Sequence, residues 1–129
     1  MDRMRRLIAD HMVMSKRTSP HVTSFVEADV PNLVLWRDKG KKAFGQREGE
    51  KLTFTPVFIM AIVQAIKEMP MVNVQVDGYN IIRKRDINIG MAAALPSGNL
   101  IVPVIKNADQ LNPVGLAKKV NALANRARA

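Results

Sequence analysis

The stretch INIGMAAALPSGNLIVPVI, residues 87–105, carries most of the information about the fold of this chain. Two apolar runs, Ile87–Leu95 and Leu100–Ile105, flank the turn residues Pro96-Ser97-Gly98-Asn99. Short apolar runs bounded by proline and glycine are typical of β-strands, so this stretch predicts two strands joined by a turn. The glycine of Asn88-Ile89-Gly90 indicates a bulge or a close approach to the backbone inside the first strand.

A hairpin and a buried helix are expected before this stretch. Val72–Val76 and Tyr79–Ile82 flank Asp77-Gly78, a dipeptide typical of hairpin turns. Earlier, Thr55-Pro56 combines a hydroxyl cap with a proline at the first helical position, which predicts a helix start. The helix that follows, Val57–Met69, is apolar almost all round. We therefore expect it to be buried on nearly every side.

The first part of the chain predicts two helices with a strand between them. Asp2–Lys16 places apolar residues at helical spacing opposite its arginines, which is typical of an amphipathic helix. His21–Val30 alternates with period two, which is typical of a strand. Pro31 suits the first turn of a second helix, and the glycines at positions 40, 45 and 49 predict a charged loop after it.

The end of the chain predicts one more helix. Asn112-Pro113 repeats the cap-and-proline start, and Leu116, Val120, Leu123 and Ala127 follow at helical spacing. The order α-β-α-α-β-β-β-β-α predicts helices packed against a mixed sheet, an α/β or α+β two-layer fold. We expect residues 1–129 to form one domain. The last helix has neither a glycine cap nor a proline stop, which raises the expectation that a longer domain continues beyond it.

Composition excludes several classes of protein. The 129 residues are 47% apolar and 24% charged, as in an ordinary globular protein, and the chain has no cysteine. Disulfides, thiolate metal sites and a cysteine nucleophile are therefore excluded. The longest apolar run, Pro56–Val63, is too short to span a bilayer, so we expect no membrane partner.

The net charge of +9 suits an anionic partner, such as a nucleic acid, an acidic protein or a phosphorylated cofactor. The aromatic residues do not interleave with the basic runs, as stacking platforms for single strands would. Nucleic-acid binding is therefore the less favoured reading. The simpler interpretation of the positive charge is a solvated basic surface.

No self-contained active site can be recognised from the residues alone. His11 and His21 belong to no paired or metal-binding spacing, so we expect no metal and give both histidines structural or solvent roles. No serine sits in a nucleophile elbow, and no glycine-rich phosphate loop is present. We therefore assign no catalytic residue.

Taken together, five segments resemble the catalytic domain of the 2-oxoacid dehydrogenase acyltransferases, the dihydrolipoamide acyltransferase (E2) components of multienzyme complexes. These segments follow one another at the family's spacing, and they are Arg5–Ala9, Ser19–Thr23, Lys51–Pro56, Ile87–Ala93 and Leu100–Asp109. The resemblance covers nearly the whole chain. It implies the N-terminal half of a fold similar to chloramphenicol acetyltransferase.

The resemblance also implies a function. Members of this family transfer an acyl group between a dihydrolipoyl-lysine thiol and coenzyme A, with the lipoyl group carried on a separate domain. They form homotrimers that assemble into larger cores and associate with E1 and E3 components. The family's general base lies in a His-x-x-x-Asp-Gly motif, and a later hydroxyl stabilises the oxyanion. That motif does not occur in this sequence, so we expect residues 1–129 alone to be inactive.

Two positions match residues that bind coenzyme A in the family. Arg37, expected just after the second helix, matches an arginine whose guanidinium suits phosphate. Thr53 matches a small hydroxyl residue of the same site. The simpler interpretations are that Arg37 is an exposed cation at a helix end and that Thr53 carries an ordinary strand or loop hydroxyl. Ala94 stands where many relatives carry a polar residue, which removes one contact to the ligand.

Three functions stay open from the sequence. The first is acyl transfer, as part of an acyltransferase core. Such a core would lie in the cytoplasm of a bacterium or in the mitochondrial matrix of a eukaryote. The second is a non-catalytic element of assembly or scaffolding. The third and least favoured is a basic nucleic-acid-binding module. The residues do not specify which acyl group, acetyl, succinyl or branched-chain, is transferred.

Overall fold

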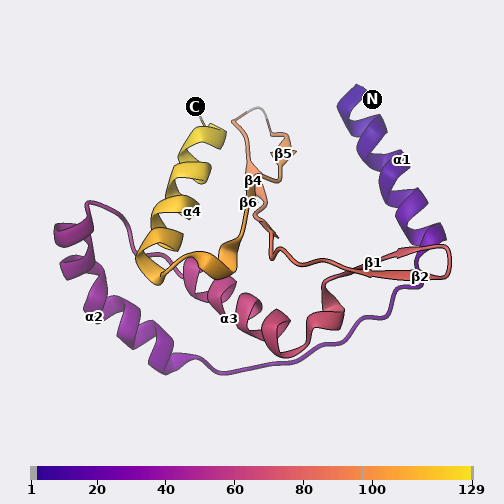
Figure 1. The fold of residues 1–129 in the computed structure, drawn as a ribbon. Coiled ribbons are helices and arrows are strands. Elements are labelled where there is room, and N and C mark those ends of the chain that lie inside the picture. The colour runs from indigo at the N-terminus through magenta and orange to yellow at the C-terminus, as the bar shows by residue number, and fades with distance from the viewer. Residues whose placement is uncertain (1–2, 97, 129) are drawn as a thin grey trace. The chain divides into compact units, whose positions relative to one another are not determined.

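The computed structural model describes residues 3–96 and 98–128 and divides the chain into two units, with the boundary between Val30 and Pro31 (Figure 1). Ser97 of the expected turn and Asp2 of the expected first helix lie outside the described residues. The expectation of a single domain over residues 1–129 stays a prediction.

The first unit holds one helix followed by an irregular segment. Helix α1, Arg3–Thr18, confirms the amphipathic helix, and none of its described side chains is buried. The expected strand His21–Val30 is wrong, because the segment has no regular secondary structure. Three of its apolar side chains, Val22, Phe25 and Val26, are at least 90% exposed. A strand requires a partner for its backbone groups, and no strand of the described chain pairs with this segment.

The second unit begins with α2, Pro31–Glu48. The expected loop around positions 40 and 45 is wrong, because the helix continues through both glycines. Each glycine costs an exposed helix only ~1 kcal/mol relative to alanine, which the surrounding helix formers can offset. Gly49 does end the helix: its φ is 69°, a left-handed value that favours glycine, and its N–H donates to the Gly45 carbonyl at 3.0 Å.

Helix α3, Thr55–Glu68, confirms the middle helix but not its cap or its burial. Phe54 is the N-cap and no side chain caps the helix, because Thr55 already has a place in the first turn. Only one side is buried, at Pro56, Ile59 and Val63, whereas Ile62 is 46% exposed. The expectation of burial on nearly every side is wrong. The helix packs against α4, Pro113–Arg128, and the short 3-10 helix η2, Ala108–Gln110. Its Phe58 side chain is about as exposed as Ile62, at 51%.

The hairpin is confirmed with a one-residue shift of its turn. A short 3-10 helix, η1, Pro70–Val72, leads into β1, Val74–Asp77, which pairs antiparallel with β2, Asn80–Arg83. Asp77 pairs with Asn80, so the turn residues are positions 78 and 79 rather than 77 and 78. Gly78 there has a φ of 58°, which explains the glycine.

The two strands expected from the stretch at positions 87–105 are each broken in two. The four short strands are β3, Ile89–Gly90, β4, Ala93–Ala94, β5, Leu100–Ile101, and β6, Val104–Ile105. β3 pairs with β6 and β4 with β5, both antiparallel. The break falls at Pro103, which has no N–H to donate, although its carbonyl still accepts from the Met91 N–H at 3.0 Å.

The core of the second unit lies between α3, η2 and α4. Asn112 caps α4 as expected, since its Oδ1 accepts from the Gly115 N–H at 2.7 Å. The buried residues that form one cluster come from α3, β6, η2 and α4 and from the segment before β3, and they are Ile59, Val63, Ile87, Ile105, Ala108, Leu116 and Val120. Helices packed with strand pairs confirm the expected α/β fold class. Across positions 3–96 and 98–128, no helix combines the length and apolar character that crossing a bilayer requires.

Candidate functional site

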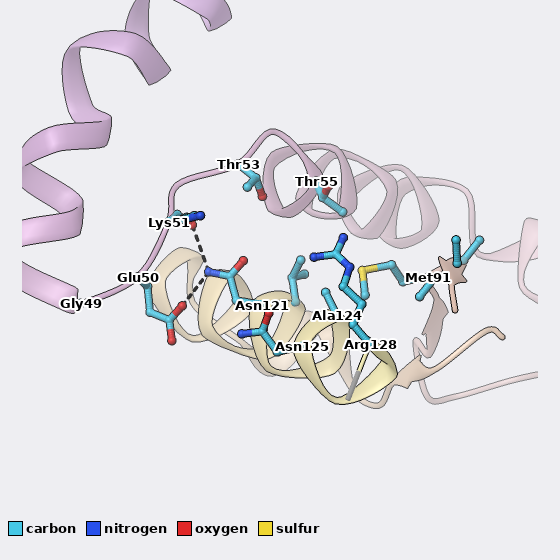
Figure 2. A pocket seen from close by; sticks show the side chains of 14 residues that line it. Gly49, Glu50, Lys51, Thr53, Thr55, Met91, Asn121, Ala124, Asn125 and Arg128 are labelled. Atoms are coloured by element: carbon cyan, nitrogen blue, oxygen red, sulfur yellow. Dashed lines mark hydrogen bonds between the residues drawn. The ribbon is translucent and has the colours of Figure 1, made fainter. Parts of the chain in front are cut away.

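A cavity of about 580 Å³ lies within the second unit and is lined by three segments far apart in the sequence. We call it the loop–α4 cavity. Its walls are the loop between α2 and α3, from Gly49 to Thr55, the strand region 91–94, and the face of α4 that carries positions 120–128 (Figure 2). This volume is within the usual range of ligand pockets, about 300–1,000 Å³.

Asn121 on α4 fixes the loop that forms one wall. Its side-chain N–H group donates to the Glu50 carboxylate at 2.7 Å and to the Lys51 carbonyl at 3.1 Å. One turn earlier, Lys118 lies 3.0 Å from the Glu48 carboxylate at the end of α2. Because α4 is packed into the core, these contacts hold the loop against a rigid element. The cavity is therefore preformed on this side.

The pKa of the Glu48 carboxyl is lowered by this arrangement. The largest cause is the hydrogen bond from Lys118, followed by the one from Arg47, whose Nε lies 2.9 Å from the same carboxylate. Glu48 is therefore held as an anion at the outer end of the loop, and its charge is met by two cations.

Thr53 supplies the least satisfied polar atom of the wall. Its hydroxyl oxygen is buried and has no hydrogen-bond partner among residues 3–96 and 98–128. Such an orphan hydroxyl is uncommon in folded proteins, because burial without a partner costs about 1–3 kcal/mol. Thr55, two residues further on, also lines the cavity. A polar ligand at this wall would satisfy the Thr53 hydroxyl.

Two cations line the cavity without a bond to the protein. Within residues 3–96 and 98–128, neither the Lys51 ammonium nor the Arg128 guanidinium has a hydrogen bond or ion pair. Figure 2 shows Arg128 reaching from α4 into the space between the helices, and Glu50 held at the other end beside Asn121. The arrangement can therefore receive an anionic or hydrogen-bonding ligand.

Arg37 bonds to the same loop but is not among the residues that line the cavity. It is inside α2 rather than after it, which corrects the expected position. Its Nε donates to the Leu52 carbonyl at 3.2 Å, its Nη1 lies 2.7 Å from the Asp38 carboxylate, and its guanidinium lies 4.9 Å from the centre of the Phe54 ring. The hydrogen bond from Arg37 is also the largest cause of the lowered pKa of Asp38. Arg37 thus supports the loop, and only Thr53 of the two expected ligand residues lines the cavity.

The two histidines are not part of this cavity. His11 is exposed on α1, and the His21 Nδ1 donates to the Ser19 carbonyl at 2.7 Å. In the part of the chain that the structure describes, no group of metal-binding side chains comes together.

Sequence reasoning missed the polar face of α4. Asn121, Asn125 and Arg128 recur at steps of four and three, so they lie on one side of the helix and all line the cavity. The cap, the proline and the apolar spacing predict this helix, and none of them draws on its polar residues. The matching period of its polar residues was a signal that could have found this wall.

Three comparisons relate the chain to known proteins. A family model described as "2-oxoacid dehydrogenases acyltransferase (catalytic domain)" matches residues 1–129. The lipoamide acyltransferase component of the branched-chain alpha-keto acid dehydrogenase complex of Bacillus subtilis is 43% identical over 97% of this chain. The dihydrolipoyllysine-residue acetyltransferase component of the pyruvate dehydrogenase complex from the same organism is 41% identical over 99% of this chain. The chain spans 29% of the length of each of these relatives.

Solved structures show the same relationship. A probable dihydrolipoamide acetyltransferase from Listeria monocytogenes matches with a TM-score of 0.92 and 41% identity, covering 99% of this chain and 54% of its own. The cubic core of a pyruvate dehydrogenase multienzyme complex matches with a TM-score of 0.90 and 37% identity, covering 99% of this chain and 53% of its own.

Proposed function

Because this chain belongs to the 2-oxoacid dehydrogenase acyltransferase family and matches part of its catalytic domain, we propose that it is part of a dihydrolipoyllysine-residue acyltransferase (E2) core. The reaction is transfer of an acyl group between dihydrolipoyl-lysine and coenzyme A. The observation that carries the proposal is the family match along the whole chain, with at least 41% identity to two curated acyltransferase components.

The proposed chemistry is exchange of one thioester for another. The sulfur of one thiol attacks the acyl carbonyl carbon, and the bond from that carbon to the other sulfur breaks. The departing sulfur keeps the electron pair and receives the proton that the attacking thiol has lost. This chain contains no His-x-x-x-Asp-Gly motif to move that proton. Its own contribution is therefore the binding of coenzyme A.

Thr53 and Arg37 are the proposed contacts to coenzyme A. The buried hydroxyl of Thr53, which lacks a partner, supports a ligand at the loop–α4 cavity. Arg37 does not line the cavity, and its bond to the Leu52 carbonyl positions the residue before Thr53. Its Nε and Nη1 bond to the Leu52 carbonyl and the Asp38 carboxylate, and its Nη2 amino group would donate to a phosphate.

We propose an assembly of three chains as the building block of a larger core, which associates with E1 and E3 components and lies in the bacterial cytoplasm or the mitochondrial matrix. The match to the cubic core of a pyruvate dehydrogenase complex supports an oligomer. A purely scaffolding role is the alternative. The following chimera separates the two.

A chimera tests the function directly. This chain replaces the matching segment of the 43%-identical Bacillus subtilis component, and the product is assayed for acyl transfer from acyl-CoA to dihydrolipoamide. We expect turnover within about tenfold of the unmodified relative. The matched control is the relative with the segment deleted, which should be inactive. A folded, assembled chimera without turnover would contradict the acyltransferase proposal and favour the scaffold.

Residues 1–129 alone are expected to be inactive in the same assay. A general base contributes ~10²–10⁴-fold and an oxyanion donor ~10²–10³-fold to such reactions, and the family's base motif does not occur in this sequence. Turnover by the 129-residue chain within tenfold of the chimera would refute this reasoning. It would return His11 and His21 to consideration as the base.

A further inference from the structure

We propose that a basic surface beside the β1–β2 hairpin docks an acidic, extended segment of a partner protein. The surface is formed by Lys67 near the end of α3, by Asn73 between η1 and β1, and by residues 83–86 at and after the end of β2. We call it the Asn73 surface. It shares no lining residue with the loop–α4 cavity and does not rest on the proposed function.

The Asn73 surface is hollowed by two cavities of about 570 and 290 Å³. Asn73, Lys84 and Arg85 line both of them, so the two cavities adjoin. The apolar residues that line the smaller cavity are Ile66, Pro70 and Ile87. A partner therefore meets an apolar patch beside polar and charged groups, which is the usual composition of a protein–protein interface.

Positive charge dominates this surface. Its lining residues include four cations, Lys67, Arg83, Lys84 and Arg85, and one carboxylate, Asp86. The Asp86 carboxylate lies 3.6 Å from the Nε of Arg85, so it is paired with one of the four cations. Within residues 3–96 and 98–128, the other three cations have no ion pair. Their charges are therefore available to the carboxylates of a partner.

Asn73 holds the backbone that carries these cations. Its side-chain N–H group donates to the Asp86 carbonyl at 3.1 Å, and its own backbone carbonyl accepts from the Lys84 N–H at 3.0 Å. The next residue, Ile87, is buried in the core, and its carbonyl accepts from the Ala108 N–H at 2.8 Å. The segment is therefore anchored on two sides. A partner does not have to order it, which lowers the cost of binding.

The free edge of β2 favours an extended polypeptide as the partner. In the described part of the chain β2 pairs with β1 alone, so its other edge has no neighbouring strand (Figure 1). Val76 and Ile81, which lie opposite each other in the hairpin, are both exposed. Among the described lining residues, neither cavity has an aromatic ring on which a nucleic-acid base could stack. A strand added to this edge would pair with the backbone, cover apolar side chains and bring carboxylates to the cations at the end of β2.

The simpler interpretation is a solvated basic surface, whose cations act only through the net charge of the chain. That interpretation predicts equal effects for any two exposed cations. Docking predicts a larger effect for Arg83 and Lys84. Lys39 and Lys42 on α2 are the matched control, because both are exposed, line neither cavity and have no ion pair among the described residues.

The first experiment titrates this chain by calorimetry with a peptide in which a run of glutamates adjoins an alternating Thr–Val segment. We expect binding that weakens with added salt, and far weaker binding of the same peptide with glutamine in place of glutamate. Arg83→Gln combined with Lys84→Gln should raise Kd about fivefold to tenfold, within the range for two exposed ion pairs. Lys39→Gln combined with Lys42→Gln should change Kd less than about twofold. No binding by the unmodified chain, or equal effects of the two double variants, would overturn the inference.

Asp86→Asn provides a variant of opposite sign. It removes the one carboxylate that repels the glutamates and frees Arg85, so Kd should fall about twofold or more. A variant that has lost its fold could not bind more tightly, so this result cannot come from unfolding. A rise in Kd would contradict the proposed electrostatic contact.

Strand pairing is tested with a peptide whose Thr–Val segment carries a central proline, which cannot donate to a neighbouring strand. We expect this peptide to bind much more weakly, and the original peptide to slow hydrogen exchange of the β2 amides that face away from β1. Equal binding of the two peptides, or unchanged exchange, would overturn the proposed strand. Tighter binding of an oligothymidylate, lost in the Arg83 and Lys84 double variant, would overturn the acidic partner in favour of a nucleic acid. None of these measurements requires turnover, so they decide the inference even if the chimera is inactive.

Discussion

Replacing Ile59 by alanine should destabilise the chain far more than the same replacement at Ile62. Both residues lie on α3, but Ile59 is 4% exposed and Ile62 is 46% exposed. Isoleucine to alanine removes three carbon atoms, worth ~0.8 kcal/mol each when fully buried. At Ile59 the sum of ~2.4 kcal/mol is increased by the cavity left in the core, so we expect a loss of about 3–4 kcal/mol. At Ile62 about half of the transfer energy applies and no closed cavity forms, so we expect about 1 kcal/mol.

The measurement is urea unfolding of both variants followed by circular dichroism. For an m-value near 2 kcal/mol/M, the midpoints of the two variants should differ by about 1 M. Equal losses at the two positions would refute the one-sided packing of α3. The titration is repeated at several protein concentrations. If the loss at Ile62 rises with concentration, a second copy of the chain covers that side of the helix.

Two further predictions concern a close approach and a titrating carboxyl. An added Cβ at Gly90 would lie 2.9 Å from Val102 Cγ1, so Gly90→Ala should destabilise the fold by about 1–3 kcal/mol. Combining it with Val102→Ala should recover most of that loss. If the losses of the two single variants simply add in the double variant, the close contact is not the cause. Lys118→Gln should raise the pKa of Glu48 toward its ordinary value of 4.5, measured by NMR titration, and an unmoved pKa would mean that the ion pair is not formed. Because the folded pKa of Glu48 is lowered, its contribution to stability is present above the ordinary pKa and is lost as the pH falls through the folded value.

The sequence patterns predicted the structure correctly where neighbouring residues decide it. The cap and proline of Asn112-Pro113 start α4 as expected, because the cap bond spans only three residues. The hairpin follows from a glycine that permits a left-handed turn at position 78. Gly90 marks a close approach, as its lack of a side chain suggested.

The sequence patterns predicted the wrong structure at several places where contacts with other segments matter. His21–Val30 has the period of a strand, yet pairing needs another strand, and alternation cannot supply one. α2 continues through two glycines because a helix tolerates small local penalties. α3 is apolar on most sides, but the number of sides that are covered depends on which elements pack against it.

The sequence by itself determined the family, the start of α4 and the hairpin, because these depend on residue type and on spacing along the chain. Only the tertiary structure decided the site. It placed Thr53 in the wall of the loop–α4 cavity and left Arg37, which bonds to the Leu52 carbonyl of the same loop, outside that wall. It also brought Lys51 and Arg128, which lie far apart in the sequence, to the same cavity. Such an arrangement depends on how α4 packs against the loop, and packing is set by contacts between segments that no local pattern records.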